Sequence, residues 1–258
     1  MFSRFTQLTM FHSKLPQLAL LLITIIWGAT FVVVKYGLTL SSPVLFVALR
    51  FAAAALAVTL ISWKSLKGVT GFELYAGAAI GLVIALGYGT QTTGLQSISS
   101  SESAFLTALY VPLVPILLWL LFAKKPHIMT WLGAALAFLG LVFLTGNGLG
   151  AISLNYGQIL TLLGSIAIAL EIILISYFAP KVNTRRVTVL QLTFASAFCF
   201  LIAPFLGETQ LPEFHPHLIM ILIGLGLASA CIQLVMNWAQ QMVDPSQAAI
   251  IYAGEPIW

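Results

Sequence analysis

The chain has 258 residues, of which 60% are hydrophobic and 7% are charged, and its formal net charge is +4. Soluble globular proteins carry about 25% charged residues, and the mean hydropathy here is +1.04. The composition therefore excludes a soluble enzyme, a disordered tail and a nucleic-acid-binding module. The few Lys and Arg residues are scattered among apolar runs and form no basic face for a nucleic-acid partner. We expect the chain to lie in a lipid bilayer.

Long apolar runs follow one another along the whole chain. Crossing the hydrocarbon takes a helix of about 20 predominantly apolar residues. Helices are expected because an open sheet would leave backbone groups unpaired in lipid, and a barrel would show short alternating segments instead. The sequence thus predicts an all-α integral membrane protein, a polytopic helix bundle. Its predicted spans are residues 17–37, 43–62, 72–93, 102–122, 129–145, 157–178, 187–206 and 217–239, with a ninth beginning near residue 246.

The loops between these spans differ in charge on the two sides of the membrane. With the N-terminus in the cytoplasm, the loops on that side hold Arg4, Lys14, Lys64, Lys67, Lys124, Lys125, Lys181, Arg185 and Arg186. The loops on the opposite side carry no Lys or Arg, and they contain Glu102, Glu208 and Glu213. Because positive charge favours the cytoplasmic side, we expect a multi-pass protein of the cytoplasmic (inner) membrane with its N-terminus inside.

Two pairs of segments suggest an internal repeat. Residues 17–36 are similar in pattern to residues 158–177, and residues 96–112 align with residues 240–256, which places their final prolines together. Identities are few, so the order of the spans is the stronger signal.

Five spans precede residue 146, so the following set starts from the opposite side of the membrane. An odd number of helices per repeat gives inverted repeats, as in many secondary transporters. We expect residues 1–145 to form the first five-helix repeat and residues 146–258 the second. By symmetry the second repeat would also hold five helices, so we expect a ten-helix fold that is truncated in the ninth helix.

A series of short motifs runs through the chain in order. They are Trp27-Gly28-Ala29-Thr30-Phe31 with Lys35, Pro43 with Ala48-Leu49-Arg50-Phe51, Ser103-Ala104-Phe105-Leu106 with Tyr110-Val111-Pro112, Asn237-Trp238-Ala239-Gln240, and Pro245-Ser246-Gln247-Ala248-Ala249 with Glu255-Pro256. In order and spacing this series resembles the EamA-type transporters of the drug/metabolite transporter superfamily. The resemblance implies ten helices in two inverted five-helix repeats and the movement of small metabolites, often outward. Glu171 departs from the pattern, where an apolar or small residue is expected.

Four ionisable residues lie within the predicted spans, where a charge is costly. Lys35 is close to the outer end of its span and is expected to reach the headgroups. Arg50 lies deeper, so it faces a cavity or pairs with a carboxylate, or else binds helix-end carbonyls. A lone carboxylate such as Glu171 would be protonated or paired in low dielectric. Its role is either proton- or substrate-linked or a buried structural hydrogen bond.

The ninth span contains Glu255 followed by Pro256, and the fourth contains Pro112 and Pro115. Proline lacks a backbone donor and frees a carbonyl one turn earlier. We expect Pro112, Pro115 and Pro256 to act as hinges that line a cavity, with Glu255 facing it. The alternative is that these prolines only bend the helices for packing.

Aromatic and amide side chains complete the candidate substrate-binding site. Small-molecule pockets combine apolar walls with a few polar anchors. The alternatives are that the aromatics form interfacial belts and that the amides bond between helices. The mid-span position of Trp27 argues against a belt for that residue. The full candidate set is Trp27, Arg50, Tyr88, Gln91, Tyr110, Glu171, Asn237, Tyr252 and Glu255.

The leading hypothesis is a secondary transporter that exports or exchanges a small organic metabolite by alternating access. Proton coupling through Glu171 or Glu255 is one interpretation, and the protein is a monomer or homodimer in lipid. A channel, a non-transporting subunit and a membrane-embedded enzyme are the alternatives. An enzyme is disfavoured because no predicted span contains Asp, and the one His within a span is His217, the first residue of the span 217–239. No cofactor is implied, and His215 and His217 lack a third ligand for a metal site.

Overall fold

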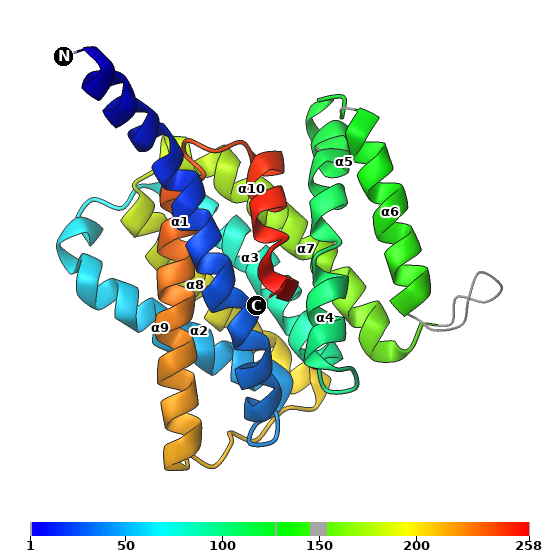
Figure 1. Cartoon of the computed structure of the whole chain (residues 1–258). Helices are drawn as coiled ribbons and strands as arrows, with labels where there is room; N and C mark the ends of the chain where they lie inside the picture. Colours follow the sequence, from blue (N-terminus) through cyan, green and yellow to red (C-terminus); the bar gives the residue numbers. More distant parts are fainter. Residues whose placement is uncertain (1, 127, 145–153, 258) are drawn as a thin grey trace.

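The computed structural model describes residues 2–126, 128–144 and 154–257, and these ranges are helical almost throughout, without a strand. Figure 1 shows long helices side by side in a bundle. The helices are α1 (Phe2–Gly37), α2 (Pro43–Ser62), α3 (Gly71–Gly94), α4 (Ser100–Thr107), α5 (Tyr110–Phe122), α6 (Ile128–Leu144), α7 (Tyr156–Phe178), α8 (Thr184–Ile202), α9 (Pro216–Ala239) and α10 (Pro245–Tyr252). Short 3₁₀ turns are η1 (Trp63–Leu66), η3 (Ala179–Lys181), η4 (Ala203–Leu206) and η5 (Glu255–Ile257).

Seven segments within the described residues are long and apolar enough to cross a membrane, with α4 and α5 together forming one of them. Large apolar side chains such as Leu22, Leu60 and Leu120 are more than 60% exposed on the bundle surface. In water such a surface would drive aggregation, whereas lipid chains solvate it. The structure therefore confirms the predicted helical membrane fold.

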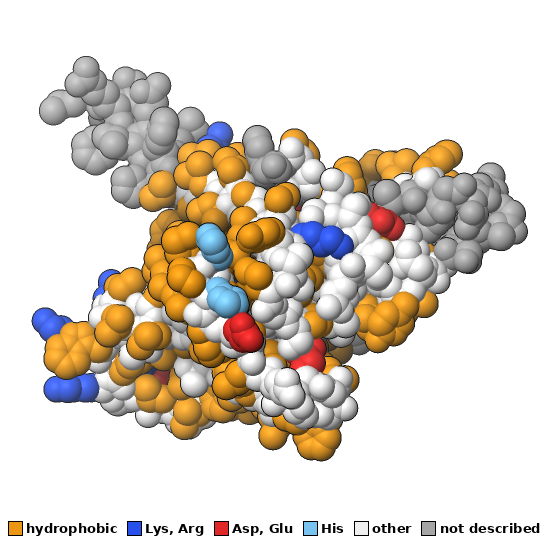
Figure 2. Space-filling view, turned by 90° about the horizontal axis from the view of Figure 1, so that it is seen from below, with side chains coloured by type: hydrophobic (Ala, Val, Ile, Leu, Met, Phe, Trp, Pro, Cys, Tyr) orange, Lys and Arg blue, Asp and Glu red, His pale blue; other side chains and the backbone are white. Residues whose placement is uncertain are grey.

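The loops alternate between two ends of the bundle (Figure 1). We call the end that carries Lys64, Lys67, Lys124, Lys125 and Lys181 the basic end. The opposite, acidic end carries Glu102, Glu208 and Glu213. Figure 2 views the molecule from this end, where acidic and histidine side chains are visible among hydrophobic ones. The separation of charge follows the predicted alternation of loops, while the membrane side that each end faces stays a prediction.

Two helices that were expected to be continuous are broken. The fourth span divides between α4 and α5 at Ala108, and the ninth ends as α10 at Tyr252, before a turn and η5. The cause is the proline that follows each break, which cannot donate to a carbonyl four residues back. At the first break Val111 N donates to the freed carbonyl oxygen of Ala108 over 3.0 Å, and at the second Gly254 N donates to Ile251 O over 3.3 Å in the turn that ends α10. In the predicted alignment of residues 96–112 with 240–256, the two breaks fall at equivalent positions.

The two halves of the chain interlock in space. Helix α3 packs against α7 and α8, α2 packs against α8 and α9, and α1 packs against α9. Close approach depends on glycine, because a Cβ at Gly81 would lie 2.7 Å from the carbonyl oxygen of Gln191. Likewise, a Cβ at Gly94 would lie 2.5 Å from the carbonyl oxygen of Gly157. The predicted boundary at residue 145 lies outside the described residues.

Candidate substrate-binding site

Four aromatic side chains meet in the interior of the bundle. The ring centroid of Trp27, on α1, lies 6.2 Å from that of Tyr88 on α3 and 6.5 Å from that of Tyr110 on α5. Tyr252, at the end of α10, meets Trp27 edge to face at 5.7 Å. All four side chains are at most 3% exposed. These candidates therefore form a buried aromatic cluster, and the belt interpretation is wrong for them.

Arg50 on α2 lies against this cluster and is 4% exposed. Its Cζ atom lies 5.6 Å from the ring centroid of Tyr88 and 5.7 Å from that of Phe51, which gives cation–π contacts. Its Nε donates to Ser229 Oγ on α9 over 2.7 Å. The terminal nitrogens have no hydrogen-bond partner among the described residues, and the ion pairs found there do not include Arg50. The guanidinium is thus a buried cation without an anion.

Glu255, in η5, is 1% exposed. Both of its carboxylate oxygens are buried and lack a hydrogen bond of good geometry within the described part of the chain, as does the hydroxyl of Tyr110. The Tyr110 hydroxyl is nevertheless close enough to the Glu255 carboxylate to interact with it. The hydroxyl of Tyr88 lies within electrostatic range of Arg50, Glu171 and Glu255. The arginine and the two carboxylates therefore belong to one buried centre around the aromatic cluster.

A ladder of amide side chains joins Glu171 on α7 to α8 and α9. Asn237 Nδ2 donates to Gln191 Oε1 over 3.1 Å, and Gln191 Nε2 donates to Gln233 Oε1 over 2.6 Å. Gln233 Nε2 in turn donates to Glu171 Oε1 over 2.7 Å. The ladder thus runs from Asn237 through Gln191 and Gln233 to the carboxylate, and Asn237 Nδ2 also donates to the carbonyl oxygen of Gln233 over 2.9 Å. Glu171 Oε2 and Asn237 Oδ1 are buried and have no hydrogen-bond partner in the ranges that the structure describes.

Gln191 was not among the predicted site residues, although its side chain takes part in two of the ladder's hydrogen bonds, one as acceptor and one as donor. Its signal in the sequence was a lone amide inside an apolar run, which is costly in a membrane unless it is bonded. A second amide, Gln240, orients the cluster: its Nε2 donates to the hydroxyl of Tyr252 over 2.8 Å and its Oε1 accepts from Ser176 Oγ over 3.0 Å.

Gln91 is buried on α3, but its side-chain Nε2 donates to Thr107 Oγ1 over 2.8 Å. This contact ties α3 to the end of α4, beside the helix break. The alternative that this amide bonds between helices therefore describes Gln91 better than direct membership of the aromatic cluster.

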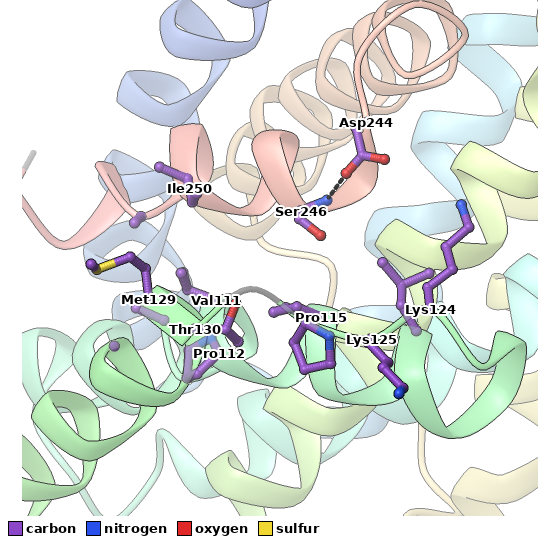
Figure 3. Close-up of a pocket in the computed structure, with 15 residues that line it drawn as sticks. Val111, Pro112, Pro115, Lys124, Lys125, Met129, Thr130, Asp244, Ser246 and Ile250 are labelled. Carbon is purple, nitrogen blue, oxygen red and sulfur yellow. Dashed lines mark hydrogen bonds between the residues drawn. The ribbon is translucent and has the colours of Figure 1, made fainter.

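Pro112 and Pro115 line a cavity of about 730 Å³ between α5, α6 and α10, and the side chains of the aromatic cluster are not among its lining residues. Figure 3 shows Lys124 and Lys125 at the basic end of this cavity and Met129 on α6. The cavity is mainly apolar, and the two prolines shape its wall on α5. Pro256, by contrast, lies in η5 directly after Glu255. The structure thus separates the three proline positions, and their hinge role stays a prediction.

Lys35 differs from its expected role at the headgroups. Its Nζ donates to the carbonyl oxygens of Leu95, Gln96 and Ile98, after the end of α3. These carbonyls lie beyond the end of α3, so no N–H of a following helical turn donates to them. Lys35 therefore ties α1 to the loop between α3 and α4 at the acidic end.

A metal centre is not indicated in the part of the chain that the structure describes, where no group of three or more His, Cys, Asp or Glu could hold an ion. Near the surface, His215 Nε2 lies 3.0 Å from Glu213 Oε2, and both side chains are at least 60% exposed.

The sequence of this chain is similar to a known protein family and to several transporters. The model of the EamA-like transporter family matches residues 14–146 and 155–258. A protein of Archaeoglobus fulgidus named "Uncharacterized transporter" is 32% identical over 244 residues, covering 94% of this chain and 75% of the relative. The Escherichia coli K12 protein "Uncharacterized inner membrane transporter YedA" is 33% identical over 163 residues, covering 61% of this chain and 52% of the relative.

The chain also matches "Uncharacterized transporter YvbV" of Bacillus subtilis, at 26% identity over 74% of this chain and 63% of the relative. It therefore spans between about half and three quarters of the length of these three relatives. A solved structure titled "Crystal structure of protein" superposes with a TM-score of 0.69 at 15% identity, over 94% of this chain and 86% of that one. At this identity the likeness is one of fold alone.

Proposed function

Because the chain belongs to the EamA-like transporter family, we propose that it is a secondary active transporter of small organic metabolites in the cytoplasmic membrane. It works by alternating access and exports or exchanges its substrate. The observation that carries the proposal is the buried centre, where Arg50 and Glu255 lie among aromatic rings without forming an ion pair. A protein that moves small polar molecules through lipid needs polar groups of this kind in its interior.

The energetic cost of the centre supports a functional role. Burying an ion without a partner costs several kcal/mol, and a hydrophobic replacement is often neutral or stabilising. Within the described residues the Arg50 side chain, at 4% exposure, makes one hydrogen bond from five N–H groups, and the Glu255 carboxylate, at 1%, makes none of good geometry. Stability alone would not favour this arrangement. A substrate that supplies the missing partners while it is bound would account for it.

Contacts between the two halves of the chain lie at both ends of the bundle. At the basic end, Arg186 Nη1 lies 3.3 Å from Glu73 Oε2 and its other nitrogens bind carbonyls of the loop after α2. At the acidic end, Glu208 accepts from the backbone N–H groups of Val44 and Leu45 at the start of α2, over 3.1 and 2.8 Å. We propose that one set of contacts opens while the other remains closed, as alternating access requires.

We further propose that residues 1–145 and 146–258 are inverted repeats with the N-terminus in the cytoplasm. The equivalent helix breaks at Ala108 and Tyr252 and the basic loops at one end support this arrangement. Proton coupling is part of the proposal, with Glu171 or Glu255 as the group that gains and loses the proton.

The test is flux in proteoliposomes loaded with a broad panel of metabolites, with efflux followed by mass spectrometry. We expect at least one compound to leave faster than from empty vesicles, and Arg50→Ala to abolish that flux. Arg185→Ala is the matched control, because Arg185 is an exposed cation at the start of α8. Equal flux in wild type and Arg50→Ala would remove Arg50 from the site. No flux of any compound from protein-containing vesicles would contradict the transporter proposal.

The same vesicles separate a transporter from a channel. A transporter saturates with substrate and shows counterflow, in which unlabelled substrate inside accelerates the uptake of labelled substrate. A channel shows neither effect. Because the centre is buried rather than open along the bundle axis, we expect saturation and counterflow.

A further inference from the structure

One serine joins the buried cation to the other half of the chain. Ser229, on α9, is 3% exposed, and its Oγ accepts from Arg50 Nε over 2.7 Å. The same hydroxyl donates to the carbonyl oxygen of Leu225, one turn earlier on α9, over 2.7 Å. A hydroxyl has a single hydrogen to donate, so this second bond leaves only its acceptor side for other partners. Ser229 is therefore arranged to hold a donor, and the donor that it meets is a guanidinium.

The serine reaches Arg50 because α2 and α9 approach each other closely beside it. A Cβ at Gly226 would lie 2.7 Å from the Cβ of Ala53 and 3.2 Å from its backbone carbonyl carbon. Gly226 precedes Ser229 by three residues and Ala53 follows Arg50 by three, so the two pairs are neighbours along the contact between these helices. Because the serine side chain is short, its bond to the guanidinium depends on this close packing.

The bond to Ser229 constrains how the guanidinium lies. The group is planar, and its N–H donors form a rigid fork. Its Nε is held by α9, while its Cζ lies 5.6 Å from the ring centroid of Tyr88 and 5.7 Å from that of Phe51. The two terminal nitrogens have no hydrogen-bond partner in the described part of the chain. Both therefore stay available to a molecule that enters the buried centre.

A second buried serine shows what a purely structural bond between the same kinds of helices looks like. Ser196 Oγ, on α8, donates to the carbonyl oxygen of Ala48 on α2 over 2.9 Å. It ties α8 to α2 through the backbone and uses its own hydrogen to do so. Ser229 differs because its hydrogen is already used within α9, so that only the bond to the Arg50 side chain links it to α2.

From this geometry we infer that Ser229 is a positioning residue, which holds the Arg50 guanidinium in the orientation that binds the transported molecule. By holding Nε it determines which N–H groups of Arg50 face that molecule. Gly226 supports this role, because it keeps α9 close enough to α2 for the serine to reach. The inference rests on the proposed transport function and adds to it the residue that sets the geometry of Arg50.

The first measurement tests the pairing itself and requires no transport. Denaturant titrations of the purified full chain in detergent compare wild type, Ser229→Ala, Arg50→Met and the double variant. Because hydrogen bonds to charged groups are the stronger ones, we expect the two substitutions to be non-additive by about tenfold or more in the unfolding equilibrium constant. The same cycle with Ser196→Ala should be additive within about twofold. Additive effects of Ser229→Ala and Arg50→Met would overturn the inference.

The second measurement tests the positioning role in proteoliposomes. Its probe is the compound of the metabolite panel that the wild-type protein releases fastest. Loss of a bond that orients a binding group weakens binding, so Ser229→Ala should raise the half-saturation concentration about tenfold and change the maximal rate by less than about twofold. Ser229→Thr keeps the hydroxyl and should stay within about threefold of wild type. Ser196→Ala, which loses a comparable buried bond, should keep the wild-type half-saturation concentration. Gel filtration establishes that each variant is folded.

The outcomes separate this inference from the transport proposal. Wild-type half-saturation in Ser229→Ala, an equal rise in Ser196→Ala, or no rescue by folded Ser229→Thr would overturn the positioning role while leaving transport intact. No flux of any compound from wild-type vesicles, with Ser229 and Arg50 still non-additive in unfolding, would contradict the transport proposal and support the pairing of these two side chains.

Discussion

Glu73→Ala is expected to weaken the contact between the two halves at the basic end. Glu73 lies in the first turn of α3, where Thr70 and Glu73 form a capping box. Its carboxylate accepts from Thr70 N over 2.8 Å, from Thr70 Oγ1 over 3.1 Å and from Asn183 N over 3.1 Å. Arg186 Nη1 completes the arrangement at 3.3 Å from Oε2.

The expected loss of stability follows from these contacts. Removing a capping interaction costs about 1 kcal/mol, and leaving a partly buried N–H such as that of Asn183 unpaired costs about 1–3 kcal/mol. The ion pair adds less, because the Arg186 side chain is 22% exposed and keeps its bonds to the carbonyls of Ser65, Lys67 and Gly68. The total is about 2–4 kcal/mol. For a protein of this size it corresponds to roughly 5–15 °C in Tm.

Thermal unfolding in detergent, followed by the loss of monodisperse protein on gel filtration, measures this change. Glu73→Gln keeps a capping side chain and one acceptor oxygen, so its Tm should fall by less than half as much as that of Glu73→Ala. Glu213→Gln, which alters an exposed carboxylate, should leave the Tm unchanged. A Glu73→Ala protein that unfolds within about 1 °C of wild type would refute the reasoning.

Three further substitutions test other contacts. Gly81→Ala should lower the free energy of unfolding by about 1–3 kcal/mol in denaturant titrations, because its Cβ would lie 2.7 Å from a backbone oxygen of α8, whereas Gly133→Ala, with open space around it, should not. Lys35→Met leaves three carbonyls unpartnered, so hydrogen exchange of residues 95–100 should accelerate, and unchanged exchange would argue against the tie. Gln191→Leu breaks the ladder to Glu171, so transport should fall about tenfold or more with the protein still folded. Wild-type flux would show the ladder to be dispensable.

The membrane fold could be predicted because the bilayer imposes simple rules on the sequence. Each apolar run longer than about 18 residues was recognisable as a helix, and the alternation of charged loops gave the relative directions of the spans. The helix breaks near Ala108 and Tyr252 were not predicted. A proline indicates that a hydrogen bond is lost, but the packing of neighbouring helices decides whether the helix bends or ends.

The candidate site could be predicted only in part. Trp27, Arg50, Tyr88, Tyr110 and Tyr252 were identifiable as unusual residues within the spans, and the structure brings them together. Their mutual distances depend on the rotation of each helix about its axis, which one sequence does not specify. The positions of other side chains, in contrast, were set by local partners that hydropathy does not reveal.

Gln91 and Lys35 are examples of such local partners. Gln91 turned to Thr107 on a neighbouring helix, and Lys35 turned to the carbonyls that follow α3. In both cases a nearby hydrogen-bond partner satisfied the polar group better than the headgroups or a central cavity would have done.

The central claim is that one buried centre is reached in turn from both sides of the membrane. Ser229 is suited to test it, because its Oγ lies 2.7 Å from Arg50 Nε and a cysteine there changes a single atom. In a background with Cys199→Ala and Cys231→Ala, Ser229→Cys is exposed to a membrane-impermeant methanethiosulfonate, first from outside and then from inside proteoliposomes of known orientation. The account predicts that the thiol reacts from each side. Reaction from one side alone, or from neither, would contradict it.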